Sequence, residues 1–182
     1  ENVLALRQPQ RESLEIFARL CDILTFSKEP NLGAELEAVH ALFPTLSSFE
    51  RDFPSFCFAL ATGIGKTRLM GACIAYLRYE KGIKNFFVMA PNLTIYDKLK
   101  ADLGNTSNPK YVFKGLDLFA KPPRIIDGDN YADFRQGTFG VNDVVINVFN
   151  ISKLNAESKG KNGEPARIKR LNEVLGTSYF EY

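Results

Sequence analysis

The chain reads Phe56-Cys-Phe-Ala-Leu-Ala-Thr-Gly-Ile-Gly-Lys-Thr67 and continues at once as Arg68-Leu-Met-Gly-Ala-Cys-Ile-Ala-Tyr-Leu77. The apolar start predicts a buried strand, and the apolar residues after Thr67 recur at helical spacing, which predicts a helix. Between the two, Gly63 and Gly65 let the backbone curl so that successive N–H groups and the helix N-terminus face one anion. The sequence therefore predicts a phosphate-binding loop.

The side chains of this loop predict a nucleoside triphosphate as the ligand. Lys66 would reach the β- and γ-phosphates, and the Thr67 hydroxyl would ligate the Mg²⁺ that bridges them. We therefore expect Lys66 and Thr67 as catalytic residues and Thr67 as the metal ligand. The residues of the loop that we expect to bind the nucleotide are Thr62, Gly63, Ile64, Gly65, Lys66, Thr67 and Arg68.

The loop departs from the strict pattern G-x-x-x-x-G-K-[ST] at its first position, where Leu60 stands. The prediction therefore rests on the segment from Thr62 to Thr67 and on the strand and helix expected around it. The alternative is a glycine turn with a surface lysine.

The composition is that of a globular domain. The chain has 182 residues, of which 45% are hydrophobic and 24% are charged, enough for one domain with a sizeable core. Its net charge of +2 permits a nucleic-acid partner without requiring one. No apolar run is long enough for a bilayer and the first residues lack the features of a signal peptide, so we expect a cytoplasmic protein without a membrane partner. Cys21, Cys57 and Cys73 lie in apolar sequence and are expected to be reduced core thiols, and His40 is expected on a helix surface.

Helices and strands are predicted to alternate along the chain. Besides the strand and helix around the loop, we expect helices over residues 9–26, 33–42, 94–103 and 166–175, strands over 85–90, 124–126 and 141–149, and a polar loop over 156–165. Alternation implies right-handed crossovers and a mostly parallel sheet with helices on both faces. We therefore expect a RecA-like α/β fold of the P-loop NTPase class, whose ligands bind beyond the carboxyl ends of the strands.

Three segments resemble, in order, motifs of superfamily 2 helicases. Leu6-Arg-Gln-Pro-Gln10 resembles their adenine-reading segment, and Ala61-Thr-Gly-Ile-Gly-Lys-Thr67 resembles the A-T-G-x-G-K-T form of restriction motor subunits. Phe86-Phe-Val-Met-Ala-Pro-Asn-Leu-Thr-Ile95 resembles the strand and turn that contact the tracked nucleic-acid strand. The resemblance covers residues 4–103 well and is closest to the helicase domain of type III restriction enzyme Res subunits.

The resemblance implies ATP with Mg²⁺ as cofactors, and adenine contacts from Arg7 and Gln10. A glutamine amide is able to accept from the adenine amine and to donate to a ring nitrogen, which selects adenine over guanine. The alternative for both residues is a solvated helix start.

The resemblance also implies DNA as a partner, with a modification or specificity subunit as a further one. Pro91, Asn92 and Thr94 stand where a strand gives way to a helix, so free N–H groups and side chains there would hold a DNA phosphate. The alternative is a plain helix cap. Weaker candidates for backbone contacts are Asn147, Asn150 and Ser152.

Acidic residues for ATP hydrolysis are not evident in the sequence. Hydrolysis needs acids after an apolar strand to hold Mg²⁺ and to orient water. No two acidic residues are adjacent. Asp143 precedes the apolar strand residues Val144 to Val148 and does not end them, Asp127 and Asp129 lie in a predicted turn, and Glu181 follows a helix. We therefore expect the chain to bind ATP weakly and not to turn it over.

The expected domain organisation is a single RecA-like domain that is incomplete at its C-terminus. Residues 1–55 would hold the adenine-reading segment, a helix and a connection, and residues 56–182 the P-loop core. The resemblance implies that the chain is the first part of a helicase or translocase motor of a restriction or phage-defence enzyme, with any endonuclease outside it. Two other functions stay open: a complete small phosphotransferase, and a nucleotide-binding module without catalysis.

Overall fold

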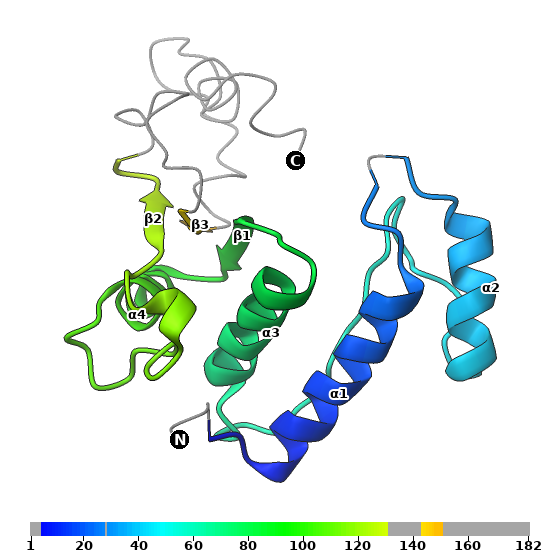
Figure 1. Cartoon of the computed structure of the whole chain (residues 1–182), viewed down its shortest axis with the longest axis horizontal. Coiled ribbons are helices and arrows are strands. Elements are labelled where there is room, and N and C mark those ends of the chain that lie inside the picture. The colour runs from blue at the N-terminus through cyan, green and yellow to red at the C-terminus, as the bar shows by residue number, and fades with distance from the viewer. Residues whose placement is uncertain (1–4, 28, 131–142, 151–182) are drawn as a thin grey trace, which may run out of the picture. The chain divides into compact units, whose positions relative to one another are not determined.

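The computed structural model describes residues 5–27, 29–130 and 143–150 (Figure 1). Contacts divide the chain into two compact units, Ala5–Cys73 and Ile74–Tyr182 with Glu1–Leu4. The boundary between the units falls inside helix α3 (Lys66–Glu80).

The first unit is built on two helices, α1 (Gln8–Ile23) and α2 (Leu32–Leu42), and both confirm the predictions. The Asn31 side chain caps α2 because its Oδ1 accepts a hydrogen bond from the N–H of Ala34 at 3.2 Å. The apolar faces of the unit bury a small core centred on Leu20, Val39 and Phe49.

The prediction of a strand before the phosphate loop is wrong. Residues 56–60 have no ladder pairing with any strand that the structure describes. Phe56 and Phe58 pack against the core of the first unit, whereas Cys57 and Ala59 are exposed. The apolar run is therefore buried on one side only, by packing within its own unit. A strand in the middle of a parallel sheet would instead be buried on both of its sides.

The cysteines are only partly as predicted. Cys21 is buried and Cys73 is half-buried. The burial of Cys73, and secondarily the electrostatic effect of Cys21, raises the pKa of Cys73 to about 12. Cys57 is exposed, so the prediction of a core thiol is wrong there. No disulfide joins the three cysteines, all of which lie in the described residues. His40 is exposed on α2, as predicted.

The second unit contains a parallel sheet of three strands. These are β1 (Asn85–Ala90), β2 (Arg124–Asp127) and β3 (Val145–Asn150), in the order β1-β3-β2. β3 pairs in parallel with both neighbours, and all six of its residues are buried. The strands confirm the predicted parallel α/β fold, and they place the carboxyl ends of β1, β2 and β3 at one edge.

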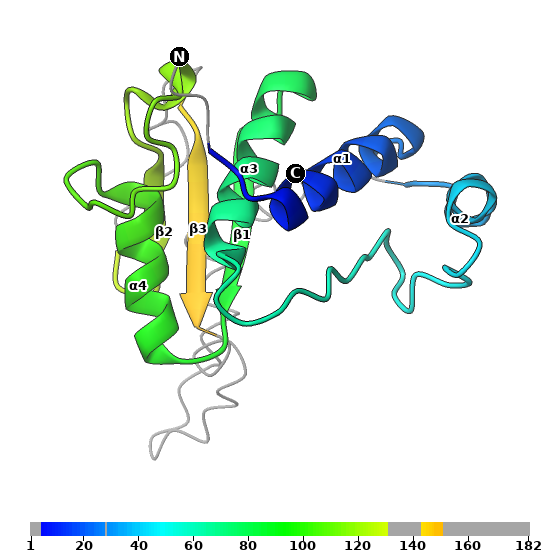
Figure 2. The same ribbon diagram turned by 90° about the horizontal axis from the view of Figure 1, so that it is seen from below.

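Helix α4 (Leu93–Gly104) follows β1 and contacts all three strands (Figure 2). Its last residue, Gly104, lies so close to β2 that a Cβ there would come 2.3 Å from Ile125 Cγ1. The helix was predicted to stop at this glycine, and the structure gives the glycine a further role in close packing. A short 3₁₀ turn, η1 (Asp117–Phe119), precedes β2.

Several predicted features lie outside the described residues. These are the loop over 156–165, the helix over 166–175, the first residues of the strand predicted over 141–149, and the individual residues Ser152 and Glu181. Among the helices that the structure describes, none combines the length and apolar character needed to cross a membrane.

Candidate functional site

The predicted phosphate loop is a backbone curl that leads into α3. Gly63 and Gly65 have φ of 82° and 93°, a left-handed conformation that favours glycine. The helix begins at Lys66, and the carbonyl of Gly65 accepts from the N–H groups of Arg68 at 3.0 Å and Leu69 at 3.2 Å. The two glycines therefore turn the chain directly into a helix N-terminus, as the sequence predicts.

The loop presents backbone donors. Within the described chain, the N–H groups of Gly63, Ile64, Gly65 and Lys66 donate to no other residue. Gly63, Gly65 and Lys66 are also exposed, and Ile64 is half-buried. Successive N–H groups at a helix N-terminus attract an anion, and the loop therefore fits the polyphosphate of a nucleotide.

The charged and polar side chains of the loop surround this backbone. Lys66 is exposed and its Nζ donates to the carbonyl of Ala61 at 3.1 Å, so the ammonium lies against the loop itself. Thr67 is half-buried in the first turn of α3, and Thr62 and Arg68 are exposed. The predicted loop residues thus lie together on one short segment, and Mg²⁺ ligation by the Thr67 hydroxyl stays a prediction.

Arg7 and Gln10 lie against the same loop, on its carbonyl side. Arg7 Nη1 donates to the carbonyl of Gly63 at 3.3 Å. Gln10 Nε2 donates at 2.9 Å to the carbonyls of both Ile64 and Gly65. Sequence reasoning predicts that Arg7 and Gln10 belong to the nucleotide site, but the contacts to the loop backbone were not anticipated. Adenine contact by these two residues stays a prediction.

Pro91, Asn92 and Thr94 lie at the carboxyl end of β1 and the start of α4, in the second unit, and all three are exposed. Asn92 Oδ1 accepts from the N–H of Ile95 at 2.9 Å and caps α4. The plain helix cap is therefore present, and the amide nitrogen of Asn92 is a donor that the cap does not use. DNA contact by these residues stays a prediction.

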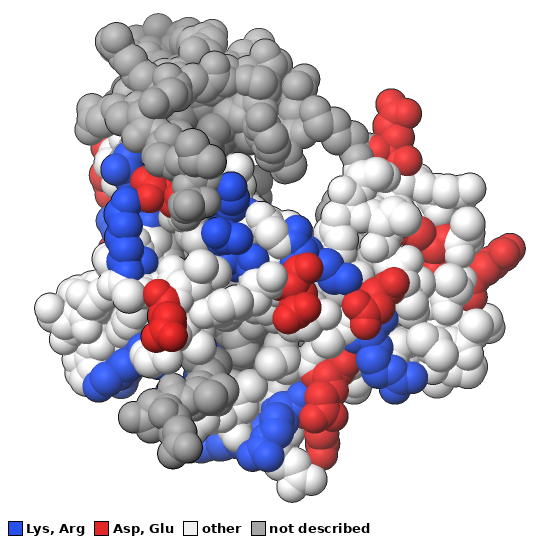
Figure 3. All heavy atoms as spheres, viewed as in Figure 1, with Lys and Arg blue, Asp and Glu red and all other residues white. Residues whose placement is uncertain are grey.

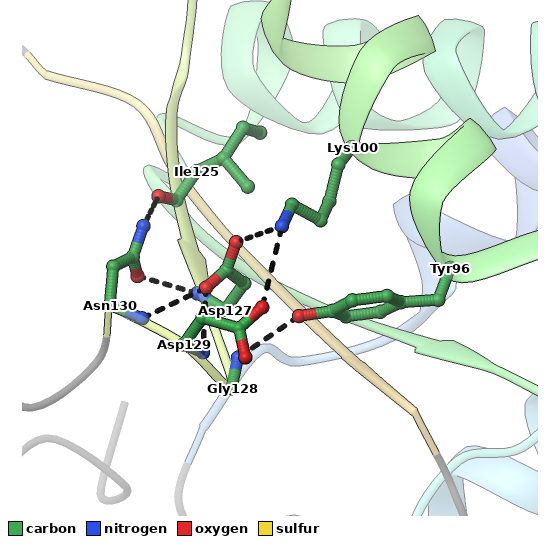
Figure 4. A network of polar contacts seen from close by, with 7 residues as sticks. All are labelled: Tyr96, Lys100, Ile125, Asp127, Gly128, Asp129 and Asn130. Carbon is green, nitrogen blue, oxygen red and sulfur yellow. Dashed lines mark hydrogen bonds and ion pairs between the residues drawn. The ribbon is translucent and has the colours of Figure 1, made fainter. Parts of the chain in front are cut away.

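A polar network that sequence reasoning missed lies at the end of β2 (Figure 4). The buried Asp127 carboxylate lies 2.5 Å from Lys100 Nζ and accepts from the N–H groups of Asp129 at 2.8 Å and Asn130 at 2.9 Å. Tyr96 Oη, from the same helix as Lys100, accepts from the N–H of Gly128 at 3.2 Å. The signals in the sequence were the predicted turn that holds Asp127 and Asp129 and the spacing of Tyr96 and Lys100 on one face of α4.

This network fixes the charge of Asp127. Burial by itself raises the pKa of Asp127, but the hydrogen bond from Lys100 and those from the turn outweigh burial and hold the pKa below its ordinary value. Asp127 is thus an ionised acid at the carboxyl edge of the sheet, and it is neutralised by Lys100. Asp129, in the turn after β2, lies 3.8 Å from the same Lys100 Nζ, and Asp143, before β3, lies 2.6 Å from Lys121 Nζ.

Charge is mixed on one face of the molecule. On the face drawn in Figure 3, the Lys and Arg side chains of the described residues are interspersed with Asp and Glu. The described residues also contain no cluster of three or more His, Cys, Asp or Glu that fits a metal ion.

Comparison with protein families shows that the model described as type III restriction enzyme, res subunit, matches residues 4–175. The chain belongs to this family. The res-subunit domain is a RecA-like P-loop domain, and the parallel sheet with helices agrees with it. Comparisons with curated proteins and with solved structures give no match.

Membership of the res-subunit family indicates the general class of activity to which the chain belongs. The family indicates a helicase-type, ATP-binding motor domain, and helicase-like P-loop domains in general use ATP and Mg²⁺. The predicted loop residues Thr62 to Arg68 lie inside the matched range, as do Arg7, Gln10 and the turn from Pro91 to Thr94.

Proposed function

We propose that this chain is the ATP-binding part of an ATP-dependent DNA helicase or translocase, the motor of a restriction or phage-defence enzyme of the type III kind. The observation that carries the proposal is the phosphate loop of a res-subunit chain. Its N–H groups from Gly63 to Lys66 have no other acceptor in the described chain, and Lys66 and Thr67 stand at the start of α3.

The nucleotide in this proposal is ATP with Mg²⁺. The loop N–H groups and Lys66 bind the β- and γ-phosphates, and Thr67 ligates the Mg²⁺. Arg7 and Gln10 lie beside the loop. The exposed Arg7 contacts the adenine, whereas the buried Gln10 bonds the loop carbonyls. The metal supplies charge neutralisation of the phosphates during transfer.

The partner in this proposal is DNA, reached by Pro91, Asn92 and Thr94 at the start of α4, with a modification subunit as a second partner in the cytoplasm. Exposed N–H groups at a helix start and the Asn92 amide bind phosphate oxygens without regard to base sequence.

Hydrolysis of ATP requires acids that orient the attacking water. Because Asp127 and Asp143 are each paired with a lysine, we expect the 182-residue chain to bind ATP without turning it over.

Phosphate release by the whole protein that contains this chain tests the proposal. With ATP and Mg²⁺, duplex DNA should stimulate release, and Lys66→Ala should abolish the stimulated rate. Release that DNA leaves unchanged would contradict a DNA motor and favour a phosphotransferase or a nucleotide-binding module without catalysis. Assay of endonuclease products in the same reactions tests the assignment to a restriction enzyme.

A further inference from the structure

Three consecutive carbonyls of the phosphate loop are held by two side chains from the start of α1. Arg7 Nη1 donates to Gly63, and Gln10 Nε2 donates to Ile64 and Gly65, at 3.3, 2.9 and 2.9 Å. Gln10 is only 1% exposed although it precedes the loop by more than 50 residues. The contacts belong to one compact unit of the chain.

The direction of these bonds matters for anion binding. Where successive N–H groups of a loop face an anion, the carbonyls of the same peptides point the other way. A side chain that bonds the carbonyls therefore fixes the loop without occupying the side where phosphate binds. The fit is close, because a Cβ on Gly65 would lie 2.7 Å from Gln10 Nε2.

The Gln10 amide is also tied to its own helix. Its Oε1 accepts from the N–H of Arg7 at 2.8 Å, which satisfies a donor at the start of α1. Both ends of the amide are therefore engaged in the protein, one with the helix start and one with the loop. An amide with two donors and two acceptor positions has limited capacity left for a base edge.

We propose that Gln10 is a positioning residue, which holds the phosphate loop in its anion-binding conformation whichever base the phosphates carry. The proposal rests on the proposed nucleotide site and adds a role for Gln10 that adenine recognition does not include. It predicts that Gln10 supports the binding of a polyphosphate that has no base at all.

Inorganic tripolyphosphate with Mg²⁺ is the probe that separates the two roles. By calorimetry, Gln10→Ala should weaken tripolyphosphate and ATP by a similar factor, on the order of 5- to 20-fold for the loss of two hydrogen bonds. Gln10→Met, an unbranched side chain of similar length that has no amide donor, should have the same effect. Gln8→Ala is the matched control, since Gln8 lies on the same helix and its side chain bonds only Glu12 at the surface.

Hydrogen exchange of the loop amides provides a readout without ligand. Gln10→Ala and Gln10→Met should speed exchange over residues 61–66, while thermal unfolding shows that the unit stays folded. The proposal is overturned if both variants bind tripolyphosphate as the unmodified chain does and lose only ATP, or if loop exchange does not change. If the unmodified chain binds neither ligand, the proposed function fails, and the exchange result still decides the role of Gln10.

Discussion

Gly65 faces Gln10 so closely that a Cβ on the glycine would lie 2.7 Å from the amide nitrogen of the glutamine. Gly63, two residues earlier, has a similar left-handed φ, 82° against 93°, but nothing lies within 4 Å of its Cβ position. The two glycines of the phosphate loop thus share a backbone constraint and differ in their surroundings.

This difference predicts unequal effects of alanine at the two positions. Gly63→Ala should cost about 1 kcal/mol of unfolding free energy for the left-handed conformation. Gly65→Ala should cost about 1–2 kcal/mol more, because the Gln10 amide must move and lose its hydrogen bonds to the loop carbonyls. Urea unfolding of both variants measures the difference, and equal losses would contradict the close contact between Gly65 and Gln10.

Gly104 gives a test of the packing between α4 and the sheet. Because a Cβ would meet Ile125 Cγ1 at 2.3 Å, Gly104→Ala should destabilise the chain by about 1–3 kcal/mol despite the better helix propensity of alanine. Gly33→Ala, in α2, is the control, since its nearest neighbour would be 3.6 Å away. Gly104→Ala combined with Ile125→Ala should show less than additive loss, and full additivity would argue against this contact.

The ion pair of Lys100 and Asp127 predicts a pH dependence of stability. The pKa of Asp127 is lowered in the folded chain, so its stabilisation is present above the ordinary carboxyl pKa and is lost as pH falls through the folded pKa. Urea unfolding from about pH 6 to pH 2 should show a decline in free energy that is shallower in Asp127→Asn. Identical slopes for the two proteins would be the contrary result.

Removal of the lysine is the companion experiment. Lys100→Met leaves the buried Asp127 carboxylate without its cation, and should cost about 1–3 kcal/mol at neutral pH, less than for a fully buried pair because Lys100 is partly exposed. The loss should shrink in acid, where Asp127 is protonated.

Asn92 allows the helix cap and the proposed DNA contact to be separated. Asn92→Ala should cost about 1 kcal/mol of stability, as should Asn31→Ala in the cap of α2. Asn92→Asp preserves the cap acceptor but places a negative charge beside the DNA phosphate. It should therefore retain stability and weaken DNA binding by the whole protein, whereas Asn31→Asp should leave DNA binding unchanged. Equal DNA affinities for all variants would contradict the assignment of Asn92.

The sequence predicts local features well because their signals are local. Each of these predictions depends on residues within a few positions of one another. They are the helix before Cys21, the strand from Asn85 to Ala90, and the turn at Gly63 and Gly65. The corresponding helix, strand and loop are all confirmed.

Contacts between distant residues could not be predicted in this way. Nothing near Gln10 in the sequence indicates that its amide bonds the carbonyl of Gly65, and nothing near Lys100 points to Asp127. The run from Phe56 to Leu60 shows the same limit, because an apolar segment does not reveal whether a strand or a helix will cover it. In the structure Phe58 packs edge-on to Phe17, with ring centroids 6.4 Å apart.

The central claim is that the loop from Thr62 to Arg68 binds ATP with Mg²⁺, and calorimetry of MgATP on the 182-residue chain tests it most directly. The unmodified chain should bind, and Lys66→Ala should weaken binding at least ~30-fold, since a charge-assisted phosphate contact is worth about 2 kcal/mol or more. Lys114→Ala, at an exposed lysine outside the loop, should bind as the unmodified chain does. Equal ATP affinity in the unmodified chain and in Lys66→Ala would contradict the account.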